Sequence, residues 1–212
     1  MKLSEKFVRQ CRKPRGLFGK LIARGMNRGH SKMAKWGLKS ISIRPNDIIL
    51  DIGCGGGQNV FNFAKKIKEG KIYGIDYSKV SVEMSKKKNK KFIQSGVVEI
   101  RHASVSSLPF PENTFDLVTG FETYYFWPDL VNDLKGILKV LKPSGALLLV
   151  NEAFKCEEES LRKRNEKWST LGNFPIHTPQ EIHQFLEEAG FAHIQLVVEN
   201  NQKYFLATGR KF

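Results

Sequence analysis

The chain has 212 residues, of which 41% are hydrophobic and 26% charged, a composition that excludes a mostly disordered protein and favours a single domain. No apolar run approaches the roughly 20 residues of a membrane-spanning helix, and no apolar stretch follows the charged start, so we expect a cytoplasmic protein without a secretory signal. Three widely spaced cysteines fit neither a disulfide framework nor a metal-binding spacing.

Positive charge is concentrated at the N-terminus. The chain carries a net charge of +14, and residues 1–44 hold 13 basic residues and one acidic residue, a net charge of +12. Residues 45–212 hold 22 basic and 20 acidic residues, a net charge of +2. This asymmetry points either to a polyanionic partner or to a solvated, lysine-biased surface. We expect a basic helical extension over 1–44, which could cap the site, in front of a nearly neutral domain over 45–212.

Hydrophobic periodicity predicts strands that alternate with helices through this domain. Ser78 is a suitable cap for one helix, and Thr178 begins the capping box of another. The expected strands cover 47–53, 71–76, 97–100, 115–120 and 146–150, followed by an antiparallel pair over 194–198 and 204–208.

This order implies an α/β fold with a doubly wound, Rossmann-like sheet. We expect seven strands, mostly parallel with an antiparallel closing strand, and additional helices at the N-terminus. Residues 154–176 interrupt the alternation with charged, helix-like sequence, which predicts a lid inserted over the site.

A glycine-rich turn follows the first expected strand. The G-x-G-x-x-G pattern of dinucleotide-binding folds fails in both registers, because Gln58 or Val60 occupies its last position. The phosphate-binding pattern G-x-x-x-x-G-K-[ST] is also absent. The pattern that fits is an acidic residue followed by three alternating glycines, filled by Asp51, Gly53, Gly55 and Gly57.

On these residues the chain resembles the class I S-adenosylmethionine (SAM)-dependent methyltransferases over residues 45–210. It is most similar to the methyltransferase type 11-like group, which contains ubiquinone/menaquinone-type and small-molecule methyltransferases. Asp76 ends the second expected strand, and segments 108–118 and 140–145 match the family's approaches to the fourth and fifth strands. Ser104 stands where the family usually has an Asp that contacts adenine, which weakens that contact or moves it to the backbone.

The resemblance implies SAM as the cofactor and S-adenosylhomocysteine as the product. It implies that Asp51 holds the ammonium group of SAM, that Asp76 binds the ribose hydroxyls and that Tyr77 lies against adenine. The residues expected to bind the cofactor are Asp51, Gly53, Gly55, Gly57, Asp76, Tyr77, Ser104, Val105 and Phe121.

The fourth expected strand runs into an aromatic segment over 121–127. Ligands of this fold bind beyond the carboxyl ends of the strands, so this segment predicts a small aromatic or apolar methyl acceptor. For Phe126 and Trp127 the alternative is packing against the next helix. A base is needed only if the acceptor arrives protonated, and no catalytic residue is assigned. The candidates are Glu122, Tyr124 and His30.

Two other functions stay open. An RNA methyltransferase would bind phosphates through the basic N-terminus, but no RNA-binding module and no Asn/Asp-Pro-Pro-Tyr/Phe signature is present. A non-catalytic SAM-binding or membrane-surface protein is the third hypothesis. Apolar residues at 17, 18, 21 and 22 lie between basic ones, a pattern typical of peripheral contact with anionic lipid.

Overall fold

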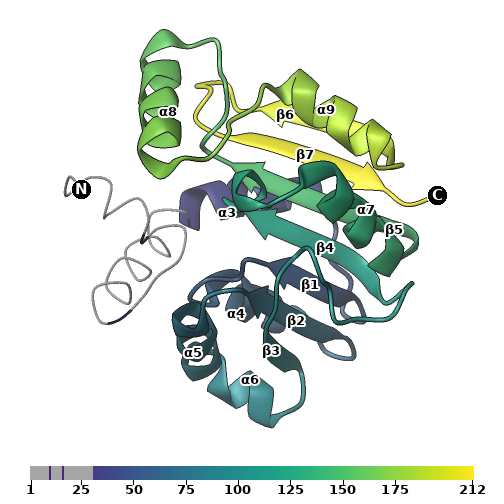
Figure 1. Ribbon diagram of the computed structural model, residues 1–212. Coiled ribbons are helices and arrows are strands. Elements are labelled where there is room, and N and C mark those ends of the chain that lie inside the picture. The colour runs from purple at the N-terminus through teal and green to yellow at the C-terminus, as the bar shows by residue number, and fades with distance from the viewer. Residues whose placement is uncertain (1–9, 11–15, 17–30) are drawn as a thin grey trace.

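The computed structural model describes residues 10, 16 and 31–212 (Figure 1). His30 and the apolar stripe at 17, 18, 21 and 22 lie outside the described residues, as does most of the expected extension over 1–44. Within the described part of the chain, none of the helices combines the length and the apolar character that crossing a membrane requires.

Strands and helices alternate along the chain. The strands are β1 (Ile48–Ile52), β2 (Lys71–Asp76), β3 (Val98–His102), β4 (Phe115–Phe121), β5 (Leu141–Asn151), β6 (Ala192–Val198) and β7 (Phe205–Arg210). The helices are α3 (Ser31–Gly37), α4 (Gln58–Ala64), α5 (Lys79–Lys88), α6 (Lys90–Gln94), α7 (Leu130–Val140), α8 (Glu159–Gly172) and α9 (Pro179–Glu188), with short 3-10 helices η1 (Leu38–Ser40) and η2 (Tyr124–Phe126).

The strands form one seven-stranded sheet in the order β3-β2-β1-β4-β5-β7-β6. The pairs among β1 to β5 are parallel, and β7 runs antiparallel to both β5 and β6. This confirms the expected doubly wound sheet. Because chain order reverses on either side of β1, the carboxyl ends of β1 and β4 open onto the crevice where ligands of such sheets bind.

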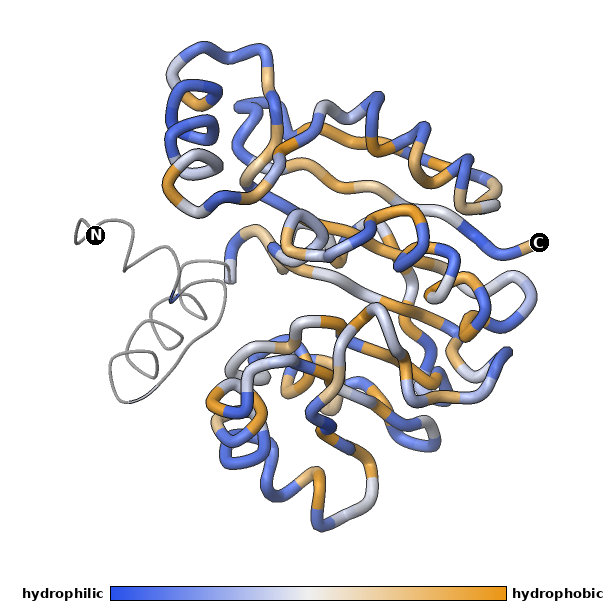
Figure 2. The backbone as a smooth tube through the Cα atoms, viewed as in Figure 1, coloured by the Kyte–Doolittle hydropathy of each residue, from blue (hydrophilic) through white to orange (hydrophobic). Residues whose placement is uncertain are grey.

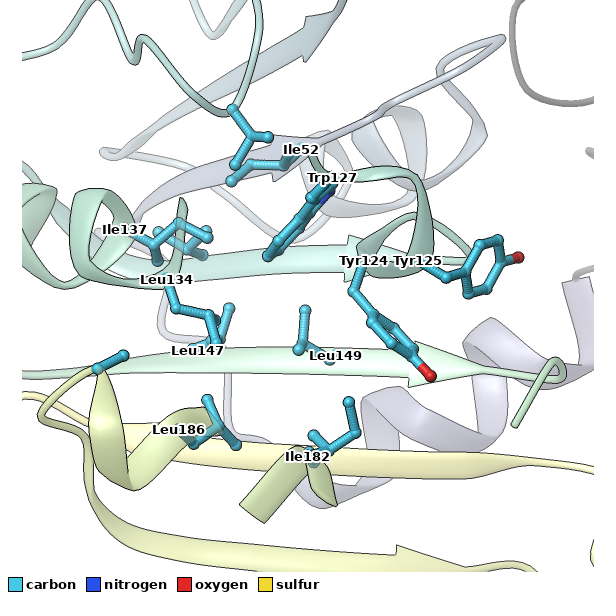
Figure 3. Close-up of a cluster of buried hydrophobic side chains, with 14 of the residues drawn as sticks. Ile52, Tyr124, Tyr125, Trp127, Leu134, Ile137, Leu147, Leu149, Ile182 and Leu186 are labelled. Carbon is cyan, nitrogen blue, oxygen red and sulfur yellow. The ribbon is translucent and has the colours of Figure 1, made fainter. Parts of the chain in front are cut away.

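The sheet is covered on both faces, which is why its central strands are apolar throughout. One face packs against α3, α4 and α5, with Met33, Val60 and Phe63 buried beneath it. The other face packs against α7 and α9, where Ile137 and Leu186 are buried (Figure 3). Side chains of β5 alternate between the two faces. Helices α5 and α9 start at the expected caps, Ser78 and Thr178, and the Thr178 capping box is complete.

Helix α3 is part of the packed domain. Met33 is fully buried, and a Cβ atom on Gly37 would collide with Val150 of β5. The boundary expected between residues 44 and 45 therefore does not mark an edge of the packing, because α3 already covers one face of the sheet.

Helix α8 lies within the segment 154–176, where an insertion was expected, and stands at one end of the sheet (Figure 1). The side-chain amide of Asn165 joins it to the chain after β5, donating to the carbonyl oxygens of Glu152 at 3.1 Å and Phe154 at 2.9 Å. Most of the helix is hydrophilic in Figure 2, and Trp168 is exposed on it. That this helix acts as a lid stays a prediction.

Candidate cofactor and acceptor site

The glycine-rich turn joins β1 to α4 through backbone conformations that favour glycine. Gly53, Gly55 and Gly57 have φ angles of 68°, 53° and 77°. A Cβ atom added at Gly55 would meet no described atom closer than the Gly53 carbonyl oxygen at 3.9 Å, and Gly55 lines a cavity at the ends of the strands. The turn therefore presents bare backbone to a ligand at Gly55.

Gly57 has a different role from the one expected. A Cβ atom there would collide with Ser85 and Asn89 of the neighbouring helix segment, and Gly57 does not line the cavity. The side-chain amide of Asn89 also donates to the Gly57 carbonyl oxygen at 3.1 Å. Gly57 thus allows α4 to begin close to α5, and its hydrogen bond from Asn89 holds the glycine-rich turn in position.

Asp51 places a buried carboxylate at the end of β1. It is 2% exposed, lines the cavity and accepts a hydrogen bond from the Thr119 hydroxyl at 2.8 Å. Burial raises the pKa of Asp51 to about 7, an effect that the Thr119 hydroxyl opposes and the nearby Asp76 charge reinforces. Within the part of the chain that the structure describes, no basic side chain forms an ion pair with it. A buried carboxylate facing a cavity is a suitable partner for a ligand cation.

Asp76 ends β2 and connects it to the glycine-rich turn. Its two carboxylate oxygens accept hydrogen bonds from the backbone N–H groups of Gly55 at 2.9 Å and Ser78 at 2.8 Å. Burial raises the pKa of Asp76, and these two N–H groups and a hydrogen bond from the Ser81 side chain oppose the shift. The two carboxylate oxygens have four lone pairs in all, so these three donors leave one acceptor position for a ligand hydroxyl.

One cavity connects these groups, with an empty volume of about 1290 Å³ that includes open solvent. Eight of the nine residues expected to bind the cofactor line it: Asp51, Gly53, Gly55, Asp76, Tyr77, Ser104, Val105 and Phe121. The Ser104 hydroxyl accepts a hydrogen bond from the Ser106 N–H at 3.3 Å, so this exposed side chain shapes its own turn.

Several lining residues were not among the expected ones. Gln58 and Asn59 follow the glycine-rich turn directly, so polar residues at the start of α4 were the signal for them. Ser31 lines the cavity from α3, and nothing local in the sequence indicates this, because α3 is brought there by its packing on β5. The aromatic residues Phe126 and Trp127 also line the cavity rather than only packing against α7.

Glu122 clamps the ends of β4 and β5 together. It has a left-handed φ of 57°, and its carboxylate accepts hydrogen bonds from the Tyr125 hydroxyl at 2.6 Å and from the Glu152 backbone N–H. Its own N–H donates to the Val150 carbonyl oxygen at 3.0 Å. Each carboxylate oxygen therefore holds one partner at the cavity wall, which gives Glu122 a positioning role.

Tyr124, a catalytic candidate from the sequence, lies in the core and does not line the cavity. It is 1% exposed, and its ring centroid lies 5.3 Å from that of Tyr125 and 6.0 Å from that of His177. Figure 3 shows its side chain directed away from Trp127. Burial raises the pKa of the Tyr124 hydroxyl. Successive side chains along η2 point in different directions, so that Phe126 faces the cavity and Tyr124 packs in the core.

Three observations test whether SAM, the cofactor implied by the resemblance, fits these residues. The buried Asp51 carboxylate matches an ammonium group, and the remaining acceptor position of Asp76 matches a ribose hydroxyl. The open side of Gly55 leaves room for a ligand chain between them. The residues present fit the cofactor.

Comparison with known proteins relates the chain to methyltransferases. Residues 50–149 match a family model described as a methyltransferase domain. The demethylmenaquinone methyltransferase of Oceanobacillus iheyensis is 30% identical over 123 residues, which cover 57% of this chain and 51% of the relative. The chain thus spans about half the length of the curated relatives it matches.

Solved structures share the fold at low sequence identity. A chain in the complex between the Haloferax volcanii Trm112 methyltransferase activator and the putative methyltransferase has a TM-score of 0.78 and 16% identity, covering 99% of this chain and 98% of that chain. A SAM-dependent methyltransferase from Aquifex aeolicus has a TM-score of 0.73 and 19% identity, covering 91% and 98%.

Proposed function

The chain carries a class I SAM-dependent methyltransferase domain, and from this premise we propose that the protein transfers a methyl group from SAM to a small aromatic or apolar acceptor by in-line displacement. When bound, the cofactor supplies a methyl group on sulfonium sulfur, and the sulfur keeps the electron pair of the broken bond as the methyl leaves. The protein has to hold the acceptor in line with that bond.

The observation that carries the proposal is the continuity of one cavity. Its lining includes the polar residues Asp51 and Asp76 and also the aromatic residues Phe126 and Trp127. A cavity that has both polar groups and aromatic surface suits a charged cofactor next to an apolar reaction partner. The name of the matched relative, which acts on demethylmenaquinone, supports an acceptor of this chemical type.

The chain's own groups contribute orientation and exclusion of water. Asp51, on β1, would hold the ammonium group of the cofactor, and Asp76, at the end of β2, would hold the ribose hydroxyls. Phe126 and Trp127 cover the reacting region with apolar surface, and holding two reactants in near-attack geometry supplies much of such a rate. Glu122 is a positioning residue, because its hydrogen bonds to Tyr125 and Glu152 hold the aromatic turn in place.

A transfer assay tests the proposal. The full chain is incubated with methyl-labelled SAM and, separately, with a demethylated menaquinone analogue, a catechol and purified RNA, and the products are identified by mass spectrometry. We expect label on an aromatic small molecule. Label on RNA alone, or cofactor binding without transfer to any aromatic probe, would contradict the proposed function.

A variant pair separates acceptor contact from general damage. Phe126→Ala removes aromatic surface from the cavity and is expected to raise the KM for the acceptor with little change in S-adenosylhomocysteine affinity. Phe92→Ala removes a ring of similar exposure from α6, outside the cavity, and is the matched control. Equal effects of both substitutions on KM would refute the assignment of Phe126.

A further inference from the structure

The nearly neutral charge of the domain hides a strong separation of charge within it. Residues 58–95, which contain α4, α5 and α6, hold ten lysines and three acidic residues, a net charge of +7. The rest of 45–212 holds 12 basic and 17 acidic residues, a net charge of −5. Of the three acids, Asp76 is buried in the cofactor site, which leaves Glu69 and Glu83 on the surface.

The fold brings two of these lysines to one aromatic pair. The ammonium groups of Lys65, after α4, and Lys88, on α5, lie 4.7 Å and 5.2 Å from the ring centroid of Phe61. Phe61 in turn meets Phe92 of α6 edge to face at 5.6 Å. Parts of three neighbouring segments thus meet at this pair. The exposed lysines of these segments, called the lysine face below, are Lys65, Lys66, Lys68, Lys86, Lys87, Lys88, Lys90 and Lys91.

Helix stability explains only part of this arrangement. Lys86, Lys87 and Lys88 occupy the last turn of α5, where cations interact favourably with the helix dipole. That effect is local to one helix end and gives no reason for further lysines after α4 and on α6. Like charges brought together repel one another, so a surface of this kind is most stable opposite an anionic partner.

We propose that the lysine face binds the anionic surface of a lipid membrane. Residues 58–95 contain no arginine, the residue that recognises nucleic-acid phosphates and bases bidentately. The ring of Phe61 is covered by lysine ammonium groups, so it is not offered to an unpaired base for stacking. A lysine-rich surface without arginine attracts anionic headgroups diffusely and needs no sequence-specific contact.

The N-terminal segment provides a second, independent membrane signal in the sequence. Residues 1–44 carry a net charge of +12, with apolar residues at 17, 18, 21 and 22 between basic ones. Stable peripheral binding generally requires two signals, such as apolar insertion together with a polybasic patch. The proposal goes beyond the methyl transfer proposed above and does not depend on it.

Vesicle sedimentation with the full chain tests the proposal. The probes are vesicles of phosphatidylcholine alone and vesicles with phosphatidylglycerol added at about one part in three. The variant Lys65→Gln/Lys88→Gln/Lys91→Gln removes three charges from the lysine face. The matched control Lys135→Gln/Lys139→Gln/Lys203→Gln removes three exposed lysines elsewhere and has the same net charge. Affinity for S-adenosylhomocysteine verifies that each variant is folded.

We expect the unmodified chain to bind the anionic vesicles, to leave the neutral ones unbound, and to dissociate as salt is added. Each lysine near an anionic leaflet contributes roughly fivefold in partitioning, so the lysine-face variant should lose between about tenfold and about a hundredfold, and the control much less. Equal losses in the two variants, or no binding to anionic vesicles, would overturn the proposal. So would a short RNA duplex that displaces the vesicles and loses affinity in the same variant, because the face would then belong to nucleic acid.

Discussion

The charge of Asp51 makes cofactor binding depend on pH in a way that can be calculated. Burial raises the pKa of Asp51 from 3.8 to about 7, which means that its charged form costs about 4 kcal/mol in the empty site. An ammonium group placed beside it offsets part of that cost. As the pH falls below 7, Asp51 takes up a proton that has to be released again on binding, so the affinity falls towards tenfold per pH unit.

Calorimetric titration with S-adenosylhomocysteine, which carries the same ammonium group, measures this effect. The affinity of the unmodified chain should fall about 25-fold between about pH 7.5 and about pH 5.5. Asp51→Asn keeps the side-chain shape but cannot ionise. Its affinity should be lower by about 2 to 3 kcal/mol at the upper pH and should vary much less with pH than that of the unmodified chain.

A second variant tests the cause of the shift. The Thr119 hydroxyl donates to Asp51 and opposes the rise in its pKa, so Thr119→Val should move the pH profile to higher pH. The reasoning would be refuted if Asp51→Asn kept the pH dependence of the unmodified chain, or if the unmodified chain bound equally well at both pH values.

Three further predictions concern the same region and one distant helix. In the ligand-free protein, the stability that protonated Asp51 provides is lost as the pH rises through about 7. Urea denaturation should therefore show that Asp51→Asn is more stable than the unmodified chain at about pH 8, by up to about 4 kcal/mol. At about pH 4 the two proteins should be equally stable. Asp76→Ala should weaken S-adenosylhomocysteine binding by about 2 to 3 kcal/mol in calorimetry, whereas the exposed control Asp129→Ala should not, and unchanged affinity in Asp76→Ala would rule out its role at the ribose. Thr178→Ala removes the capping box of α9 and should lower the free energy of unfolding by about 1 kcal/mol without changing that affinity; a loss of cofactor binding would show that α9 is coupled to the site.

The elements that carry a local signal were predictable from the sequence. Alternating short apolar runs and helical stripes indicated the sheet, and the caps at Ser78 and Thr178 marked two helix starts. The glycines of the motif directly follow the first strand in the chain, so their spacing alone located the turn between β1 and α4. Strand β5 begins earlier than expected, at Leu141, because pairing with Phe115 of β4 draws it into the sheet before the register shifts.

Which side of a turn each residue faces was decided only by the tertiary structure. Tyr124 and Phe126 are near neighbours in one aromatic segment, yet one is buried in the core and the other lines the cavity, since the direction of a side chain depends on what packs against the turn. Ser31 reaches the cavity because α3 packs on β5.

The distribution of charge shows the same difference between what the sequence determines and what the tertiary structure decides. The sequence by itself determined the net charge, the glycine-rich motif and the acid at the end of the second strand, because these depend on residue identity and short-range spacing. Only the tertiary structure brought Lys65 and Lys88, which are distant in the sequence, to the same ring of Phe61, because distances between charges on separate segments are set by how those segments pack on the sheet.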